Sequence, residues 1–345
     1  MPKVQLLIFI LTMLTIGTKA SEVDNFTKRN LVTIDATDIV NEITNKYFIL
    51  GVERANKKVK ACDEKVLYKS IRHYFRNHYF GKLNKELYRS AEVPRVKIPL
   101  NEGIYRRFLW YDAFVPGIYG RIFGNPNASV VRLSDNLVGV DKFEHFVGSG
   151  HKYFQNYYVK KKSLFSALKV GLRAETGFMG AVTTGVLSYA DMVANFNGMR
   201  FWNHILQKND DILGENIGPY VVCEKNRWQV VKEFDWNTYV DAGFDEAINC
   251  SEFRNDRLLK KVQYELKKLA KDADSISYCP ATSEPLQELI EKYGDLSPFL
   301  INTKGHRKAH KFKYYEKLWK ELEGRGVYGP SVEASVEYRP RKEKR

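Results

Sequence analysis

Apolar residues recur at intervals of three and four along much of the chain, which is the spacing of amphipathic helices. Two stretches near the N-terminus, 39–60 and 63–88, show this spacing, and the second carries a broad aromatic stripe. The same spacing predicts helices at 251–272, 285–292 and 310–322. The pattern therefore predicts a mainly α fold with a helical bundle-like core.

Short β-like runs interrupt the helical pattern in two places. Residues 130–140 predict a small hairpin, and the runs 220–223 and 228–231 are separated by four polar residues, as in a second hairpin. Residues 235–249 predict a short helix between that hairpin and the helix at 251–272. We therefore expect a small β-hairpin element beside the helical core.

The composition divides the chain into five regions. Residues 1–20 are typical of a signal peptide, because Lys3 precedes the apolar run 4–16 and Thr18-Lys19-Ala20 resembles a cleavage site. After it we expect an N-terminal helical region at 21–100, a central helical motif domain at 101–210, a C-terminal α+β subregion packed on the core at 211–325, and a disordered basic tail at 326–345.

Charge and export together narrow the partners. The net charge is +14, and cleavage of the signal would remove Lys3 and Lys19 and leave +12. Such an excess attracts anionic material, and export favours cell-wall polymers, outer-membrane material or lipid head groups over nucleic acid. The most apolar later stretch, 164–187, contains Lys169, Arg173 and Glu175, which are costly in hydrocarbon. We expect a periplasmic or secreted protein of a Gram-negative bacterium, without a transmembrane segment.

Four cysteines follow the predicted cleavage point, and an even number in an oxidising compartment favours two disulfides. No two of them have the short C-x-x-C spacing of a zinc site. Of the three possible pairings, we favour Cys223 with Cys250, because the segment between them resembles a compact β-turn unit. Cys62 would then pair with Cys279.

Ionisable and amide side chains recur within the otherwise apolar stretch 140–204. Asp141 precedes His145 by four residues, so on a helix the carboxylate can orient and charge the imidazole. Asn195 shares a helix face with Ser188 and Asp191, and Asn is a poor residue for a helix interior. We therefore predict that these side chains meet between helices.

Helix capping offers a structural explanation for part of this pattern. Ser188-x-x-Asp191 fits a capping box, and Asp141-x-x-Glu144 is a similar arrangement. Capping would account for these four residues without any chemistry. Capping leaves Glu175 and Asn195 unexplained.

Glu175 lies among small residues that allow close helix packing or leave room for a ligand. Burial would raise the pKa of its carboxyl unless a cation such as Arg173 or a protonated His145 meets it. Glu175 could then be a general acid, or a buried group that ties three helices together through His145 and Asn195.

The candidate residues follow from these observations. The candidate catalytic residues are Glu175, His145, Asp191 and Asp141, and the candidate binding residues are Asn195, Ser188, Lys142, Trp110 and Tyr111. A metal site formed by His145, Glu175 and Asp191 matches no recognised ligand spacing, and the cations around His306 and His310 would repel a metal ion. We therefore expect neither a metal nor a cofactor.

The order Asp141-Lys142-x-x-His145-Phe146, then Glu175, then Ser188-x-x-Asp191-x-x-Ala194-Asn195-x-x-Gly198 carries a resemblance. It resembles the pattern shared by VanZ-like proteins and a family of predicted bacterial periplasmic lipoproteins of unknown function. The resemblance covers residues 141–198 and implies a shared helix arrangement, without a reaction. The chain departs from the lipoproteins in having no anchoring Cys after Ala20. It departs from the membrane-embedded VanZ-like proteins in carrying Lys169 and Arg173.

Two functions fit these features. The first is an exported envelope-associated protein that binds anionic cell-wall or outer-membrane material. The alternative is an envelope-polymer hydrolase, acting on a glycan, with Glu175 as general acid and Asp191 or Asp141 as the second carboxylate. The aromatic residues between Trp110 and Phe123 could then stack against sugars.

Overall fold

The computed structural model describes residues 22–77, 80–113, 128–272, 279 and 283–325. The predicted signal peptide and the predicted basic tail lie outside these residues. Within the described residues, none of the helices combines the length and the apolar character needed to cross a membrane.

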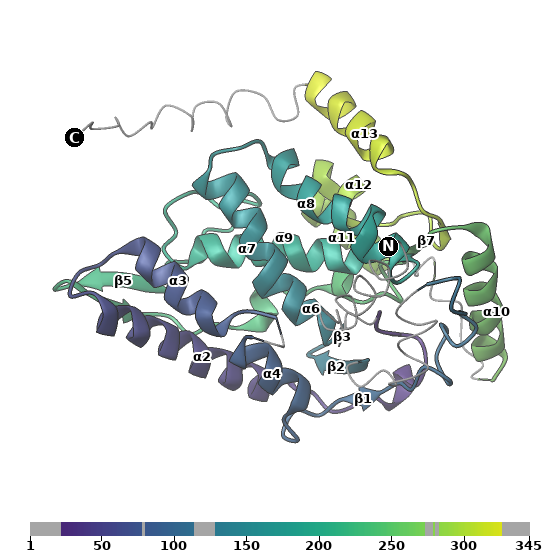
Figure 1. The fold of residues 1–345 in the computed structure, drawn as a ribbon, viewed down its shortest axis with the longest axis horizontal. Helices are drawn as coiled ribbons and strands as arrows, with labels where there is room; N and C mark the ends of the chain where they lie inside the picture. Colours follow the sequence, from purple (N-terminus) through teal and green to yellow (C-terminus); the bar gives the residue numbers. More distant parts are fainter. Residues whose placement is uncertain (1–21, 78–79, 114–127, 273–278, 280–282, 326–345) are drawn as a thin grey trace, which may run out of the picture.

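The fold is organised around α9 (Tyr189–His204), in which every residue is buried. A continuous helical segment packs along it and consists of α6 (Asp141–Glu144), the π-helical turn η3 (His145–Ser149), α7 (Gly150–Phe154) and a second π turn, η4 (Gln155–Val159). Helix α8 (Leu164–Thr176) packs against α7 and α9, and a third π turn, η5 (Phe178–Val182), follows it. Figure 1 shows α9 in the middle of the molecule, beside these helices.

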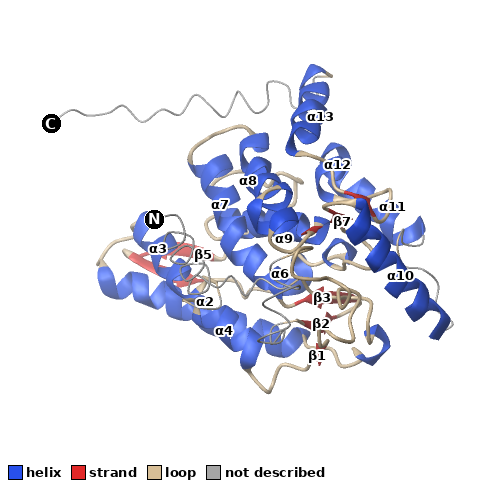
Figure 2. Ribbon diagram, turned by 45° about the vertical axis from the view of Figure 1, so that its right-hand side comes forward, coloured by secondary structure: helices blue, strands red, loops and turns tan. Residues whose placement is uncertain are grey.

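The remaining helices flank this centre (Figures 1 and 2). Helices α2 (Thr37–Lys58), α3 (Glu64–Tyr74) and α4 (Lys82–Arg89) pack together on one side, after the short 3₁₀ turn η1 (Arg29–Leu31). The C-terminal helices are α10 (Asp256–Asp272), α11 (Ser283–Tyr293), α12 (Ser297–Leu300) after the 3₁₀ turn η8 (Gly294–Leu296), and α13 (Phe312–Gly324). The fold is mainly helical, as predicted.

The predicted helix at 63–88 is wrong in one respect, because the structure divides it into α3 and α4. Phe75 leaves the helical conformation, with a ψ of 62°. The chain then folds back until Gly81 lies against the backbone of Arg76, where an added Cβ would approach the Arg76 nitrogen to 2.6 Å. Only glycine fits this close approach.

The strands form small sheets, and both predicted hairpins are confirmed. Strands β1 (Val96–Lys97), β2 (Ser129–Leu133) and β3 (Asn136–Gly139) form an antiparallel sheet in which Val131 pairs with Val138. Strands β5 (Val221–Glu224) and β6 (Arg227–Val230) form the second hairpin, whose turn residues Lys225 and Asn226 have positive φ. Strand β7 (Glu252–Phe253) pairs antiparallel with β4 (Val186–Leu187) and parallel with β8 (Arg307–Lys308).

The short helix predicted at 235–249 is wrong. Two separate 3₁₀ turns, η6 (Trp236–Thr238) and η7 (Ala242–Phe244), occupy this segment. Asp235 and Asp241 each accept a hydrogen bond from the backbone two residues later, so each acid starts its own turn. The chain therefore changes direction twice, and residues 245–250 reach back into the core.

The two predicted disulfides are present, but the favoured pairing was wrong. Cys62 pairs with Cys223 and Cys250 with Cys279. The β5–β6 hairpin packs on α2, where Asn56 bonds the backbone of Trp228 in both directions, so Cys223 lies beside the end of that helix. The turn-like segment between Cys223 and Cys250 predicted that these two residues pair, whereas the packing of the hairpin on α2 places Cys62 beside Cys223.

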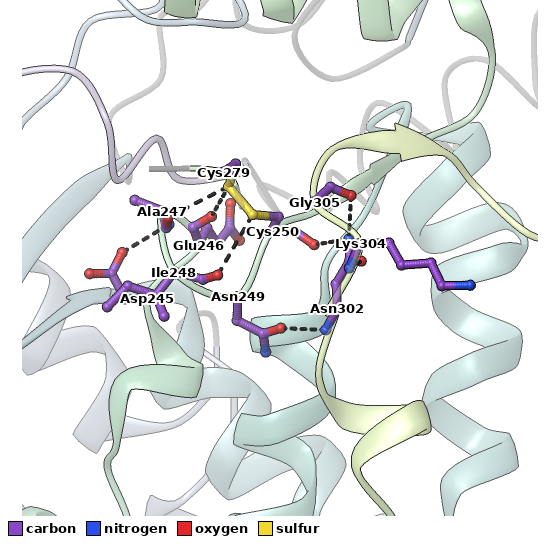
Figure 3. The surroundings of a disulfide bond; sticks show 10 residues. All are labelled: Asp245, Glu246, Ala247, Ile248, Asn249, Cys250, Cys279, Asn302, Lys304 and Gly305. Atoms are coloured by element: carbon purple, nitrogen blue, oxygen red, sulfur yellow. Dashed lines mark hydrogen bonds between the residues drawn. A yellow bond between two sulfur atoms is a disulfide. The ribbon is translucent and has the colours of Figure 1, made fainter. Parts of the chain in front are cut away.

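Figure 3 shows how the second disulfide holds residues 245–250 in place. The Cys279 sulfur lies 3.7 Å from the Glu246 carbonyl oxygen and 3.5 Å from that of Ala247. The Asn249 side chain accepts a hydrogen bond from the backbone of Asn302. These contacts fix the direction of the Glu246 side chain, which enters the candidate site.

Candidate functional site

A fully buried lysine lies at the centre of the candidate site. The Nζ of Lys142 lies 2.8 Å from Asp141 Oδ2, 2.7 Å from Asp191 Oδ1 and 2.6 Å from Glu246 Oε1, and its side chain is 0% exposed. An ammonium group has three N–H donors, and three carboxylates surround it here. The three acids come from α6, α9 and the 245–250 loop, so this one charge joins three segments.

The start of α9 brings further acids to the same place. Ser188 is the N-cap of α9, and its hydroxyl oxygen accepts a hydrogen bond from the Asp191 backbone at 3.2 Å. The same hydroxyl donates to Glu246 Oε1 at 2.9 Å, and the Ser188 backbone N–H donates to Glu175 Oε2 at 3.3 Å. The first turn of a helix stabilises negative charge, so its place beside these carboxyl groups is favourable.

His145 links this cluster to the surface. Its Nε2 lies 3.0 Å from Asp191 Oδ2, its Nδ1 lies 3.2 Å from Asn195 Oδ1, and a quarter of the side chain is exposed. Both ring nitrogens therefore face oxygen atoms, and a ring nitrogen that carries a proton can donate to the oxygen beside it. The contact with His145 explains why Asn195, a poor residue for a helix interior, lies within α9.

The environment displaces the pKa values of two neighbouring acids in opposite directions. Burial, with the charge of Asp191 added to it, raises the pKa of Glu175 well above its usual range. Burial would also raise the pKa of Asp191, but the charges of His145 and Lys142 outweigh it and lower that pKa. The surroundings of Glu175 therefore favour its protonated form, and those of Asp191 favour its ionised form.

Two acids of the cluster were missed by the sequence analysis. Burial, opposed by Lys142, raises the pKa of Glu246 to about 7. Burial and the charge of Glu246 raise the pKa of Glu22, whose Oε1 accepts a hydrogen bond from Thr184 at 2.8 Å. Neither acid lies within the stretch 140–204, whose pattern singled out Glu175.

The structure brings most of the candidate residues together. Seven lie in or against the cluster, namely Asp141, Lys142, His145, Glu175, Ser188, Asp191 and Asn195. Trp110 and Tyr111 do not: Trp110 is 70% exposed, and Arg257 and Lys261 of α10 lie over the ring of Tyr111.

The two capping predictions have different outcomes. Ser188 caps α9 as predicted, although the Asp191 side chain faces Lys142 and His145 instead of closing a capping box. Asp141 was wrongly predicted as a cap, because Val140 is the N-cap of α6 and the Asp141 carboxylate is taken by Lys142.

Three groups of side chains in the described part of the chain have ligand atoms close enough to surround a metal ion. His145, Glu175 and Asp191 form one, and Glu22, Asp141 and Glu246 form another, each with ligand atoms within 4.8 Å of one another. In the third, with His306, the sulfurs of Cys250 and Cys279 are bonded to each other and are unsuited to a metal. Burial lowers the pKa of His306 to about 4, and its ring packs against Phe26 and Phe253.

A second buried network of ion pairs and hydrogen bonds lies at the other end of α9. Asp211 accepts hydrogen bonds from Arg200 at 3.0 and 3.1 Å and lies 2.9 Å from Nε2 of His204. The other nitrogen of His204 lies 2.9 Å from the hydroxyl of Tyr239. All these side chains are enclosed, so the network holds α9 against its neighbours.

A basic pocket of about 290 Å³ lies against the π turn that carries His145. Arg72, Arg76 and Lys152 line it, together with Glu144 and Gly148 from the helical segment around η3. Nη1 of Arg72 is buried and has no hydrogen-bond partner within the described residues. Neighbouring cations and an unpaired guanidinium nitrogen suit an anionic ligand.

Comparisons with known proteins give no match for this chain, whether with family models, curated proteins or solved structures.

Proposed function

We propose that the protein is an exported hydrolase of the bacterial cell envelope, with Glu175 as general acid. The observation that carries the proposal is a pair of acids, Glu175 and Asp191, with carboxyl oxygens within 4.8 Å of each other and pKa values displaced in opposite directions. Two acids whose environments separate their pKa values are the usual basis of acid and base roles in one site.

The chemistry follows from the two protonation states. The protonated Glu175 would donate its proton to the leaving oxygen of the scissile bond, and the ionised Asp191 would supply the second carboxylate. Their short separation is nearer to that of enzymes in which the second carboxylate attacks directly. His145 and Lys142 would hold Asp191 in its ionised form and in position.

The substrate we propose is an anionic envelope polymer. The pocket lined by Arg72, Arg76 and Lys152 shares the η3 region with His145, the side chain through which the cluster reaches the surface. Two disulfides and the predicted signal peptide support export, and we propose the Gram-negative periplasm as the compartment. A helix arrangement shared with VanZ-like proteins and the periplasmic lipoproteins remains a prediction.

A second candidate function is binding of the same anionic material without turnover. It is favoured by the burial of the two acids, since Glu175 is 3% and Asp191 4% exposed, whereas the basic pocket is open to solvent. In this alternative the cluster is a structural support for the pocket.

The two functions are separated by incubating the mature protein with peptidoglycan and with outer-membrane extracts. Hydrolysis should release soluble fragments, and Glu175→Gln should reduce the rate by about 10²–10⁴-fold while circular dichroism stays unchanged. The control is Glu265→Gln, which changes another buried acid, paired with Arg106 and Arg107. Retention on the polymer without released fragments would support the second function, and neither retention nor release would contradict both.

A further inference from the structure

Beyond the proposed hydrolase, the acid cluster contains more carboxyl groups than basic groups. Five carboxyl groups meet in it, those of Glu22, Asp141, Glu175, Asp191 and Glu246, and Lys142 and His145 supply the neighbouring cations. Lys142 contacts three of the acids, and His145 contacts Asp191. Within the described residues, Glu22 has no ion pair with either cation.

Three carboxyl oxygens of the cluster have neither a hydrogen-bond partner nor an ion pair among the described residues. They are Oε2 of Glu22, Oδ1 of Asp141 and Oε2 of Glu246, and each atom is buried. Glu22 and Glu246 are 7% and 1% exposed as residues, so both are shielded from bulk solvent. A buried carboxylate oxygen without a partner is costly, and three from neighbouring residues call for a shared ligand.

The second oxygen of each of these acids is already engaged. Thr184 donates to Glu22 Oε1, and Lys142 donates to Asp141 Oδ2 and Glu246 Oε1. These contacts orient the three carboxyl groups, and one ligand atom from each lies within 4.8 Å of the others. This is the preorganisation that a cation site requires.

We propose that Glu22, Asp141 and Glu246 bind a hard divalent cation such as Ca²⁺, Mg²⁺ or Mn²⁺. An all-carboxylate donor set suits these ions better than Zn²⁺ or Cu²⁺, which prefer nitrogen and sulfur ligands. The side chain of Asp141 is 15% exposed and gives the ion a way in. The ligands come from segments more than a hundred residues apart, which is why no metal-ligand spacing was recognisable.

The test is a titration of the mature, EDTA-dialysed protein with Ca²⁺, Mg²⁺ and Mn²⁺, each followed by calorimetry and thermal unfolding. One ion should bind per chain, and saturation should raise Tm by at least about 3 °C, because the ion binds only the folded state. Glu22→Gln should weaken binding by at least about tenfold and abolish the rise in Tm. This variant keeps the Thr184 contact and leaves Lys142 untouched.

Two control variants decide where the ion binds. Glu175→Gln changes the other group of potential ligands, and Glu265→Gln changes a remote buried acid, so both should bind the ion as the unmodified protein does. Binding lost in Glu175→Gln but kept in Glu22→Gln would overturn the assignment, as would a folded protein that binds none of the three ions at 10 mM. If Glu22→Gln fails to fold, Asp141→Asn replaces it, with the same expected loss. Hydrolase activity is not a readout, so failure of the proposed function leaves this result unaffected.

Discussion

At the scale of single residues, the protein depends on buried charges that are each matched by several partners. Lys142 has three carboxylates around it, and Asp211 has an arginine and a histidine. Breaking a buried pair leaves the remaining charge without compensation, which costs more than the pair itself contributes. Substitutions at these residues should therefore have large and pH-dependent effects.

Lys142→Met should destabilise the protein by about 3–5 kcal/mol at pH 7, because Asp141, Asp191 and Glu246 lose their common cation. The loss should be smaller at pH 5, where carboxyl groups with raised pKa values, such as that of Glu246, are protonated and neutral. Urea unfolding at both pH values measures this. The control is Lys152→Met, which changes an exposed lysine on the same helical segment and should alter the free energy of unfolding by less than about 0.5 kcal/mol. If Lys142→Met lost the same stability at pH 5 as at pH 7, the explanation would be contradicted.

Asp211→Asn should remove the acid dependence of stability that this residue contributes. Burial alone would raise the pKa of Asp211, but His204 and Arg200 outweigh it and hold the pKa below 3.8. A lowered pKa stabilises the fold above the unfolded value of 3.8, and this stabilisation disappears as the pH falls through the lower folded value. The variant should lose about 3–5 kcal/mol at pH 7, and the difference should narrow below pH 3.8. Denaturant unfolding of both proteins from pH 7 to pH 2.5 measures this. A difference in the free energy of unfolding that stays constant over this range would contradict the explanation.

At the scale of elements, the crossing of the η3–α7 segment with α9 places His145 beside Asp191 and Asn195. Gly150 and Gly198 meet at this crossing, and a Cβ added to Gly150 would lie 2.6 Å from the Gly198 Cα. A Cβ added to Gly198 would overlap the carbonyl oxygen of Phe146. The helices approach so closely only because neither position carries a side chain.

Gly198→Ala should therefore destabilise the protein by about 3 kcal/mol or more, since backbone atoms must move apart. The matched control is Gly148→Ala in η3, where an added Cβ meets nothing within 4 Å. This control should be neutral or stabilising by up to about 1 kcal/mol, because Ala favours a helix. Chemical denaturation of both variants gives the comparison, and similar stabilities for the two would contradict the packing argument.

The elements themselves were largely predictable, whereas their meeting points were only partly so. Periodicity located α2, α10, α11 and α13, and the acid, imidazole and amide pattern indicated that Glu175 and Asp191 meet His145. Glu22 and Glu246 were missed because each comes from a segment whose place is set by tertiary contacts, such as the Cys250–Cys279 disulfide. Local patterns carry no information on such contacts, and for the same reason the turn-like segment between Cys223 and Cys250 led to the wrong disulfide pairing.

At the scale of the whole molecule, the two disulfides join very different lengths of chain. Cys62 and Cys223 are separated by 161 residues, and Cys250 and Cys279 by 29. The first therefore constrains the unfolded chain far more than the second. The second is nevertheless closer to the site, because it borders Glu246.

Replacing each pair of cysteines by serines should separate the effect of a disulfide on stability from its effect on the site. Loss of Cys62–Cys223 should cost about 5 kcal/mol and loss of Cys250–Cys279 about 3.5 kcal/mol, from the loop lengths. The second variant should in addition weaken cation binding, because the loop that carries Glu246 is released, whereas the first should leave it intact. Denaturation and calorimetry on both variants measure the two effects, and an unchanged affinity in the second would show that the loop is held by other contacts.

The position of Lys142 also has a consequence for assembly. The three N–H donors of its ammonium all have carboxylate partners only when α6, α9 and the 245–250 loop have come together. An intermediate that lacks one of them would leave a buried N–H donor without a partner, so such intermediates are penalised. Cooperative folding of these segments follows, with unfolding transitions that coincide when secondary structure and tryptophan fluorescence are monitored in parallel.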